Sequence, residues 1–198
     1  MSTVIYKPRN SELAGERHRL LELIKTRATI QGEVTKLSSG KLSDLYVDAK
    51  MVTLSPEGAY LTGRIFLEFL KDDKIDAIGG MTMGADPIVG ALAAISYHEN
   101  YPIRTFMVRK EPKKHGKKKW IEGPLLDNDR IAVIDDVTTT GASILLAIKI
   151  IKENTNCEIV KVITLVDRLE GAKENLSKEG YELISIFDRH DLVANKNE

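Results

Sequence analysis

The sequence predicts an α/β protein in which a mostly parallel central sheet is flanked by helices on both faces. Short apolar runs of strand length alternate along the chain with longer segments whose apolar residues recur at helical spacing. The run at residues 131–134, Ile-Ala-Val-Ile, is apolar throughout, as is typical of a parallel strand buried on both faces. We expect about four or five strands with helices between them.

The composition is that of an ordinary globular protein. The 198 residues suffice for one well-buried domain, and 42% of them are hydrophobic and 29% are charged. Lys and Arg together number 29, and so do Asp and Glu, so the overall charge gives no attraction to nucleic acid or to an anionic membrane. We therefore expect no nucleic-acid partner and no membrane partner.

Cysteine usage and the first residues indicate a cytoplasmic protein. Cys157 is the only cysteine, which excludes an intrachain disulfide and a cysteine-based metal cluster. The first ten residues lack the apolar core of a signal peptide, and no apolar run reaches membrane-spanning length. A cytoplasmic location is the expectation.

The N-terminal part is expected to hold a helix and a hairpin. Apolar residues recur at helical spacing over residues 11–29, with Asn10 or Ser11 as the N-cap. Residues 34–37 and 45–49 have the composition of two strands and predict a hairpin. Taken alone, this hairpin would be a structural flap.

Two further helices enclose a strand and a glycine-rich loop. Ser55 as N-cap, with proline at the first helical position, favours a helix that runs to about residue 71. Residues 75–78 predict a buried strand, and the glycine-rich segment 79–87 leads into a helix at 88–97. The N–H groups of such a loop can bind an anion, although Gly-Gly is also the commonest way to make a tight turn.

A strand at 103–108 is followed by a strongly basic segment, 109–124. Proline and glycine interrupt helix formation there and no apolar face is present, so we expect a long mobile loop. Taken by itself, the segment is a solvated loop or a contact for nucleic acid or a phosphoprotein. The basic residues that precede Trp120 are Arg109, Lys110, Lys113, Lys114, Lys117, Lys118 and Lys119.

The segment 130–144 carries the strongest functional signal. Asp135 and Asp136 come at the carboxyl end of the strand at 131–134, where open α/β sheets place their ligands. A turn rich in Thr, Gly and Ser follows, and it can hold an anion through hydroxyls, N–H groups and the helix dipole. The carboxylates can accept hydrogen bonds from sugar hydroxyls or hold water around a magnesium ion. These features together predict a ribose-phosphate site.

The alternative for this segment is an ordinary strand-to-helix turn, in which Ser and Thr cap the helix and the aspartates are solvated. Adjacent aspartates at the end of a buried strand repel each other, however, and a plain turn gains nothing from that repulsion. We therefore favour a functional site.

An arginine follows the next expected strand at the same edge of the sheet. Arg168 can make a two-pronged contact with a carboxylate of a ligand. The plainer alternative is an ion pair with Asp167 or Glu170, which contributes little if it is exposed. The elements expected in the last part of the chain are a strand at 158–166, a helix at 172–178, a strand at 183–187 and a short helix near Asp191.

Three stretches resemble known enzyme families. The apolar strand, the two acids and Thr-Thr-Thr-Gly-x-Ser at 131–143 closely resemble the phosphoribosyl diphosphate (PRPP) motif of the type I phosphoribosyltransferases. The order Arg-Lys-x-x-Lys-x-His-Gly from Arg109 resembles the catalytic lid of the orotate phosphoribosyltransferases, which other type I members lack. The segment around Ser39-Gly40 resembles their hood over the pyrimidine, with Ser38 where members often carry lysine and Tyr46-Val47 where they carry consecutive aromatics.

The resemblance implies the type I phosphoribosyltransferase fold, with a mostly parallel central sheet, a small N-terminal hood and a flexible lid loop. It implies a single domain over residues 1–198, with the helix and hood at 1–54, the core at 55–198 and the lid at 109–123. The implied reaction converts orotate and PRPP to orotidine 5'-monophosphate and pyrophosphate in de novo pyrimidine biosynthesis. The implied cofactor is Mg²⁺.

The resemblance also assigns roles to individual residues. It implies Lys113, Asp135 and Asp136 as catalytic residues and Thr139 and Arg168 as orotate-binding residues. Magnesium is expected to be held mainly by substrate and water, so no dedicated protein ligands are assigned. The implied PRPP-binding residues are Arg109, Lys110, Lys113, His115, Asp135, Asp136, Val137, Thr138, Thr139, Thr140, Gly141, Ala142 and Ser143.

A homodimer is also implied, because in the family the lid reaches into the partner's active site. Two other functions stay open. One is a phosphoribosyltransferase for another base, since Ser38, Tyr46 and Val47 depart from the family in the base-facing hood. The other is a regulatory protein that binds PRPP without catalysis, for which a closing lid rich in lysine is superfluous. A basic loop that binds RNA would instead lose affinity steeply with added salt.

Overall fold

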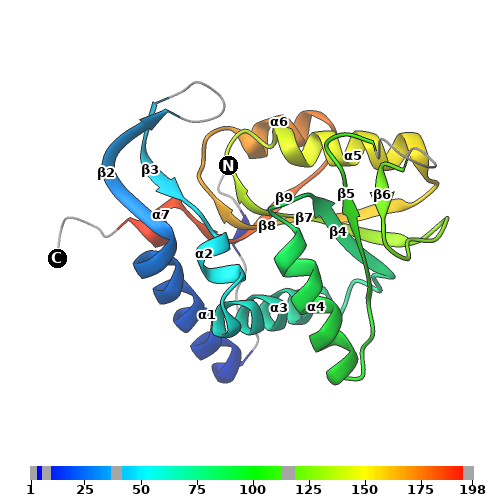
Figure 1. Ribbon diagram of the computed structural model, residues 1–198, viewed down its shortest axis with the longest axis horizontal. Helices are drawn as coiled ribbons and strands as arrows, with labels where there is room; N and C mark the ends of the chain where they lie inside the picture. Colours follow the sequence, from blue (N-terminus) through cyan, green and yellow to red (C-terminus); the bar gives the residue numbers. More distant parts are fainter. Residues whose placement is uncertain (1–3, 6–9, 37–41, 113–118, 194–198) are drawn as a thin grey trace.

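The computed structural model describes residues 4–5, 10–36, 42–112 and 119–193, and these form one large sheet and one small sheet. The large sheet has seven strands in the order β1-β9-β8-β7-β4-β5-β6, and all neighbours are parallel except β5 and β6 (Figure 1). The expected mostly parallel sheet is therefore confirmed. Its strands are β1 (Val4–Ile5), β4 (Ala77–Met81), β5 (Arg104–Val108), β6 (Ile121–Glu122), β7 (Arg130–Thr138), β8 (Glu158–Asp167) and β9 (Leu183–Asp188).

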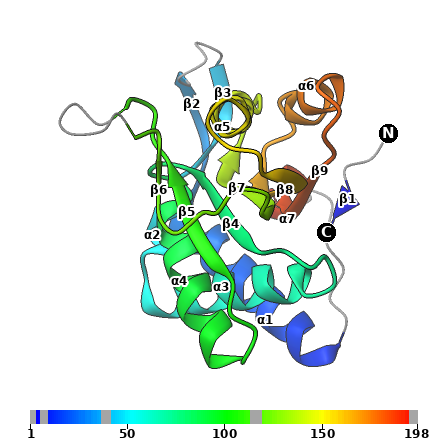
Figure 2. The same cartoon turned by 90° about the vertical axis from the view of Figure 1, so that its right-hand side faces the viewer.

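Helices cover both faces of this sheet, as expected. In Figures 1 and 2, α1, α3 and α4 lie on one face, and α5 and α6 lie on the other. Within the part of the chain that the structure describes, no helix is both long enough and apolar enough to cross a membrane. The helices are α1 (Ser11–Leu23), α2 (Lys50–Thr53), α3 (Pro56–Leu70), α4 (Asp86–His98), α5 (Ala142–Asn154), α6 (Ala172–Lys178) and α7 (Arg189–Leu192).

The apolar run of β7 explains why the sheet is covered on both sides. Successive side chains of a strand point to opposite faces. Ala132 and Ile134 belong to the hydrophobic cluster that includes residues of α1, α3 and α4, whereas Ile131 and Val133 belong to the cluster formed with α5 and α6. All four residues are fully buried. The burial of a side chain such as isoleucine stabilises the fold by roughly 1.5–3 kcal/mol, so β7 anchors both layers.

The small sheet is the hairpin expected near the N-terminus. It consists of β2 (Thr29–Lys36) and β3 (Leu42–Val47), which pair antiparallel and rise from the end of the first helix (Figure 1). The strands begin earlier than predicted, because α1 ends at Leu23 and a π-helical turn at Ile24–Ala28 carries the chain into β2. The predicted N-cap is confirmed, since the Asn10 side chain accepts a hydrogen bond from the Leu13 amide.

The prediction that Gly79 and Gly80 form part of a loop was wrong, because both lie within β4. The reason is close packing between strands. A Cβ atom at Gly79 would lie 2.3 Å from the carbonyl oxygen of Phe106, and one at Gly80 would lie 2.0 Å from that of Ile134. These glycines thus serve the contacts of β4 with its neighbours rather than a turn.

The prediction of a long mobile loop was wrong for the two ends of segment 109–124. β6 pairs with β5, and the amide of Arg109 donates to the carbonyl of Trp120 at 2.9 Å. Trp120 and Ile121 also pack against the hydrophobic cluster of α5 and α6. The segment predicted to form the lid therefore begins and ends next to a short antiparallel pair of strands, and residues 113–118 lie outside the described residues.

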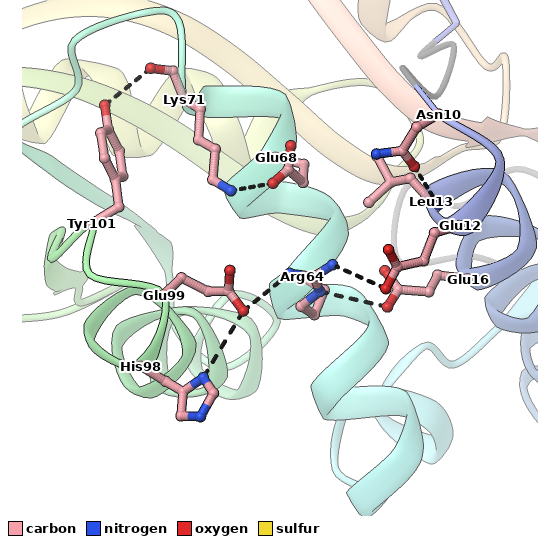
Figure 3. A network of polar contacts seen from close by, with 10 residues as sticks. All are labelled: Asn10, Glu12, Leu13, Glu16, Arg64, Glu68, Lys71, His98, Glu99 and Tyr101. Carbon is pink, nitrogen blue, oxygen red and sulfur yellow. Dashed lines mark hydrogen bonds and ion pairs between the residues drawn. The ribbon is translucent and has the colours of Figure 1, made fainter.

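A half-buried arginine joins the helices that cover one face of the sheet (Figure 3). Arg64 on α3 lies 3.1 Å from a carboxylate oxygen of Glu99, directly after α4, and 3.5 Å from one of Glu16 on α1. Glu12 on α1 lies 4.0 Å away. Only 13% of the Arg64 side chain is exposed, so these ion pairs are screened less than surface pairs. They connect α3 to α1 and to the end of α4.

Candidate active site

The carboxyl ends of four neighbouring parallel strands meet at one edge of the sheet. β5, β4, β7 and β8 lie side by side in that order, and the segments that follow them carry most of the polar residues predicted to form a site. Thr138 of β7 is in register with Asp167 of β8, which brings Arg168 next to the threonine-rich turn. The expected meeting of these segments is confirmed.

The threonine-rich turn forms a cavity in front of α5. Its volume is about 190 Å³. Gly141 adopts φ +78°, a left-handed conformation that favours glycine, and α5 begins at the next residue without a side-chain cap. The alternative in which Ser and Thr merely cap this helix is therefore wrong. The cavity is lined by Asp135, Val137, Thr138, Thr139, Thr140, Gly141, Ala142 and Ser143.

Hydrogen bonds from the β8–α6 connection and from α6 hold the threonine-rich turn in place. The amide of Arg168 donates to the carbonyl of Thr138 at 2.9 Å, and the amide of Ala172 donates to that of Thr139 at 3.1 Å. The Asn175 side chain donates to the carbonyl of Thr140 at 2.9 Å. Asn175 was not predicted, because nothing in the sequence relates it to a turn 35 residues earlier.

The hydroxyl of Thr138, the first of the three threonines, makes a hydrogen bond inside the sheet. The Thr138 hydroxyl donates to the hydroxyl of Thr164 on β8 at 2.9 Å, and both side chains are buried. Its hydroxyl is therefore engaged within the sheet, which leaves the prediction of anion-binding hydroxyls to the residues after it.

Asp135 and Asp136 form a buried pair at the end of β7. They are 7% and 8% exposed. The amide of Asp136 donates to Asp135 Oδ1 at 3.1 Å, and the amide of Val137 donates to Asp136 Oδ1 at 2.9 Å. Burial and then the neighbouring charge of Asp136 raise the pKa of Asp135 to about 8. Burial also raises the pKa of Asp136, against the opposing effects of the Val137 amide and Lys50.

A second cavity, of about 230 Å³, lies on the other side of this pair. The loop after β4 closes it and lies directly on the acids. A Cβ atom at Gly84 would lie 2.2 Å from Asp136 Oδ1 and 3.2 Å from Asp135 Oδ1. The two cavities share Asp135, Val137 and Ser143, so a single ligand can occupy both. The second cavity is lined by Lys50, Met81, Thr82, Met83, Gly84, Lys110, Asp135, Asp136, Val137 and Ser143.

The structure brings one of the predicted lid residues to this cavity. Lys110 lines it, whereas the Arg109 guanidinium lies 3.6 Å from Glu122 at the base of the lid. Lys113 and His115 fall outside the described residues. Their predicted roles thus stay predictions.

Arg168 lies beside the site but in neither cavity. It is 4% exposed, and its guanidinium lies 2.9 Å from a carboxylate oxygen of Glu170. The ion pair considered from the sequence therefore exists, but it is buried rather than solvated. Tyr46, one of the hood residues that depart from the family, is partly exposed on β3, and Ser38 lies outside the described residues.

Lys50 lines the site but was not predicted from the sequence. Its ammonium lies 2.6 Å from Asp48 Oδ1 and 4.0 Å from Asp136 Oδ2. It enters the site from α2, directly after the hairpin, and 86 positions separate it from Asp136. Spacing along the chain could not have revealed this contact.

Comparison with known proteins connects this geometry to a family. Residues 51–191 match the phosphoribosyl transferase domain. The orotate phosphoribosyltransferase of Aquifex aeolicus is 48% identical over 180 residues, which are 90% of this chain and 98% of that protein. The chain belongs to the orotate phosphoribosyltransferase family. Membership agrees with the resemblance of both the central motif and the lid.

Solved structures of the family have the same fold. Orotate phosphoribosyltransferase of Mycobacterium tuberculosis H37Rv, in complex with Fe(III) dicitrate, superposes with a TM-score of 0.77 at 36% identity, covering 89% of this chain and 98% of that chain. The same enzyme in complex with PRPP superposes with a TM-score of 0.73 at 34% identity, with the same coverage. The type I phosphoribosyltransferase fold is thereby confirmed.

The close approach of Gly84 to the acids generates a first prediction. In Gly84→Ala the new methyl group would overlap the Asp136 carboxylate, so the loop and the acids must move apart. We expect phosphoribosyl transfer to fall about 100-fold, the usual cost of misplaced reacting groups, with the far-ultraviolet circular dichroism unchanged. Gly90→Ala on α4 is the matched control, since its Cβ meets no atom within 4 Å. Equal activities of the two variants would contradict this description of the loop.

The raised pKa of Asp135 generates a second prediction. In the folded protein the Asp135 carboxyl group keeps its proton up to about pH 8. In the unfolded chain its pKa is near 3.8, so it loses the proton at a lower pH. This contribution to stability is complete below the lower pKa and is lost as pH rises through the higher one. Asp135→Asn removes it. Between pH 5 and 9 we expect the melting temperature of the ligand-free protein to fall by several degrees more in the wild type than in the variant. Parallel curves would contradict the pKa shift.

Proposed function

We propose that the chain transfers a phosphoribosyl group from PRPP to orotate, giving orotidine 5'-monophosphate and pyrophosphate in de novo pyrimidine biosynthesis. The observation that carries this proposal is the pair of cavities that meet at the two acids. One cavity is lined by a turn suited to a phosphate, and the other is lined by lysines. PRPP has the matching shape, with a phosphate at one end, a diphosphate at the other and ribose hydroxyls between them.

PRPP is assigned to the site as follows. The 5-phosphate occupies the cavity formed by residues 137–143, where the first turn of α5 supplies N–H groups and the positive end of its dipole. The ribose hydroxyls donate to Asp135 and Asp136. The diphosphate occupies the second cavity, next to the backbone of residues 82–84 and to Lys110. The lid residues assigned to cover it are Arg109, Lys110, Lys113 and His115.

The reaction needs no covalent nucleophile from the protein. The bond between the ribose C1 and the pyrophosphate oxygen breaks, its electron pair leaves with pyrophosphate, and a ring nitrogen of orotate bonds to C1 and loses its proton. The protein must therefore neutralise the leaving group, align the base and exclude water. Lys113 is assigned the largest contribution in the transition state, and Asp135 and Asp136 hold the ribose on which positive charge develops.

Magnesium fits this site as an ion held by substrate and water. Among the described residues, no group of three or more His, Cys, Asp and Glu is arranged to hold a metal. Asp135 and Asp136 are two buried carboxylates next to the cavity assigned to the diphosphate, and Mg²⁺ usually keeps several waters and binds one or two carboxylates plus substrate phosphates. When bound, the ion neutralises charge on the diphosphate.

Orotate is assigned to the space between the threonine turn and the hood. The Thr139 backbone lies beside the ribose site, and Arg168 is held next to the same turn. In this arrangement the Arg168 guanidinium contacts the orotate carboxylate while Glu170 holds it in position. Tyr46 on β3, whose side chain is partly exposed, is assigned to stack on the ring.

A homodimer with lids that act on the partner's site is also part of the proposal. Large apolar side chains stand in solvent next to the cavity-lining Lys50 and Gly84, namely Met51 (60% exposed), Leu54 (69%) and Met83 (71%). Exposed apolar side chains that gather in one patch are typical of a surface covered by another chain, and we propose that these three form such a patch. The proposal further includes a cytoplasmic location, no nucleic-acid partner, and one domain with helix and hood at 1–54, core at 55–198 and lid at 109–123.

Turnover of orotate is the prediction that tests the function. Purified protein mixed with PRPP, Mg²⁺ and orotate should consume the orotate, as measured by its absorbance, and should leave adenine, hypoxanthine, uracil and nicotinate unchanged. Lys113→Ala should be slower by about 10²–10³-fold, the usual effect of removing one contact to a transition state. Turnover of another base would overturn the base assignment, and PRPP binding without any turnover would indicate a sensor.

Mixed subunits test the lid in trans. In a dimer of one Lys113→Ala subunit and one Arg168→Ala subunit, one site then combines an intact Arg168 with the partner's intact lid. We expect each mixed dimer to regain up to half of the wild-type activity, whereas dimers of either variant alone stay inactive. Mixed dimers isolated with two different affinity tags and found inactive would show that each lid serves its own subunit.

A further inference from the structure

Lys50 lies where the hood joins the body of the protein. It is the first residue of α2, two positions after Asp48, whose amide donates to the carbonyl of Ala28 directly before β2. The side chain of Asp48 accepts a hydrogen bond from the Lys50 amide at 3.2 Å and holds the Lys50 ammonium at 2.6 Å. The backbone and the side chain of Lys50 are thus both fixed by the end of the hairpin.

Lys50 lines the cavity assigned to the diphosphate. It shares that cavity with the loop 82–84, with Lys110 and with the two acids. Its distance of 4.0 Å from Asp136 Oδ2 is too long for a hydrogen bond. The side chain is 38% exposed, so it can move towards a ligand while Asp48 still holds it.

The charge balance of this cavity requires cations. The acids Asp135 and Asp136 line it and bring no positive charge, and the loop 82–84, Thr-Met-Gly, brings none of the positive charge that a diphosphate needs. Among the lining residues the positive charges are those of Lys50 and Lys110. The hydrogen bond with Asp48 raises the pKa of Lys50, and the charge of Asp136 adds to this, so the ammonium stays protonated at neutral pH.

We propose that Lys50 is a catalytic residue that binds the diphosphate of PRPP from the hood side, in place of a cation in the loop after β4. The inference rests on the proposed function. On binding, the ammonium keeps its hydrogen bond to Asp48 and turns from Asp136 to a diphosphate oxygen. When the C1–O bond breaks, its electron pair passes to that diphosphate, and Lys50 stabilises the added charge without giving up its proton.

Lys50→Met tests this role, because methionine keeps the length of the side chain without its charge. We expect the affinity for PRPP, measured by calorimetry with Mg²⁺, to fall about 10- to 100-fold, as for the loss of one charge-assisted hydrogen bond. Turnover with orotate should fall by at least as much. Ribose 5-phosphate lacks the diphosphate, so its affinity should change less than about twofold. Lys50→Arg should restore part of the PRPP affinity.

Lys149→Met is the matched control, since this lysine is exposed on α5 and pairs only weakly with Glu153 at 3.9 Å. It should bind both ligands as the wild type does. Unchanged PRPP affinity and turnover in Lys50→Met would overturn the inference. An equal loss of affinity for both ligands would also overturn it, because it would show that Lys50 acts only through Asp136 and the fold. A wild type that binds PRPP but does not consume orotate would reject the proposed function separately.

Discussion

The arrangement of the site depends on one costly feature, two adjacent carboxylates buried at the end of β7. Asp135 and Asp136 are almost fully covered, and burial together with their mutual repulsion raises the pKa of Asp135 to about 8. The structure tolerates this cost because the hydrophobic run that precedes them fixes β7 between two helical layers. A flexible loop could not hold two such groups together against their repulsion.

Neighbouring elements bring glycine and lysine residues next to this pair of acids. Gly84 lets the backbone of the loop after β4 lie so close to the acids that a side chain at this position would overlap Asp136. Lys50 brings a cation from the side of the hood. Lys110 brings another from the base of the lid. Gly84 and Lys110 follow two neighbouring strands of the large sheet and Lys50 belongs to α2, so the three groups converge only when the whole fold has formed. A bound magnesium ion would add further positive charge next to the acids and the diphosphate.

Much of this could be predicted from the sequence, because the informative patterns are local. The strand at 131–134, the helix at 172–178 and the N-cap at Asn10 depend on neighbours in the chain, and all are confirmed. Features that depend on distant pairing were missed. β1 and β6 are short strands that exist only because β9 and β5 offer free edges, and Gly79 and Gly80 fit between strands whose order the sequence does not reveal. Lys50 and Asn175 reach the site from elements that only the fold brings near.

The measurement that tests this account most directly is a crystal structure of the protein with PRPP and Mg²⁺. The account predicts the 5-phosphate within residues 137–143, the ribose hydroxyls on Asp135 and Asp136, and the diphosphate between Gly84 and Lys50. A diphosphate found in the threonine turn, or a ribose that contacts neither aspartate, would contradict the assignment of the two cavities and with it the role given to the buried acids.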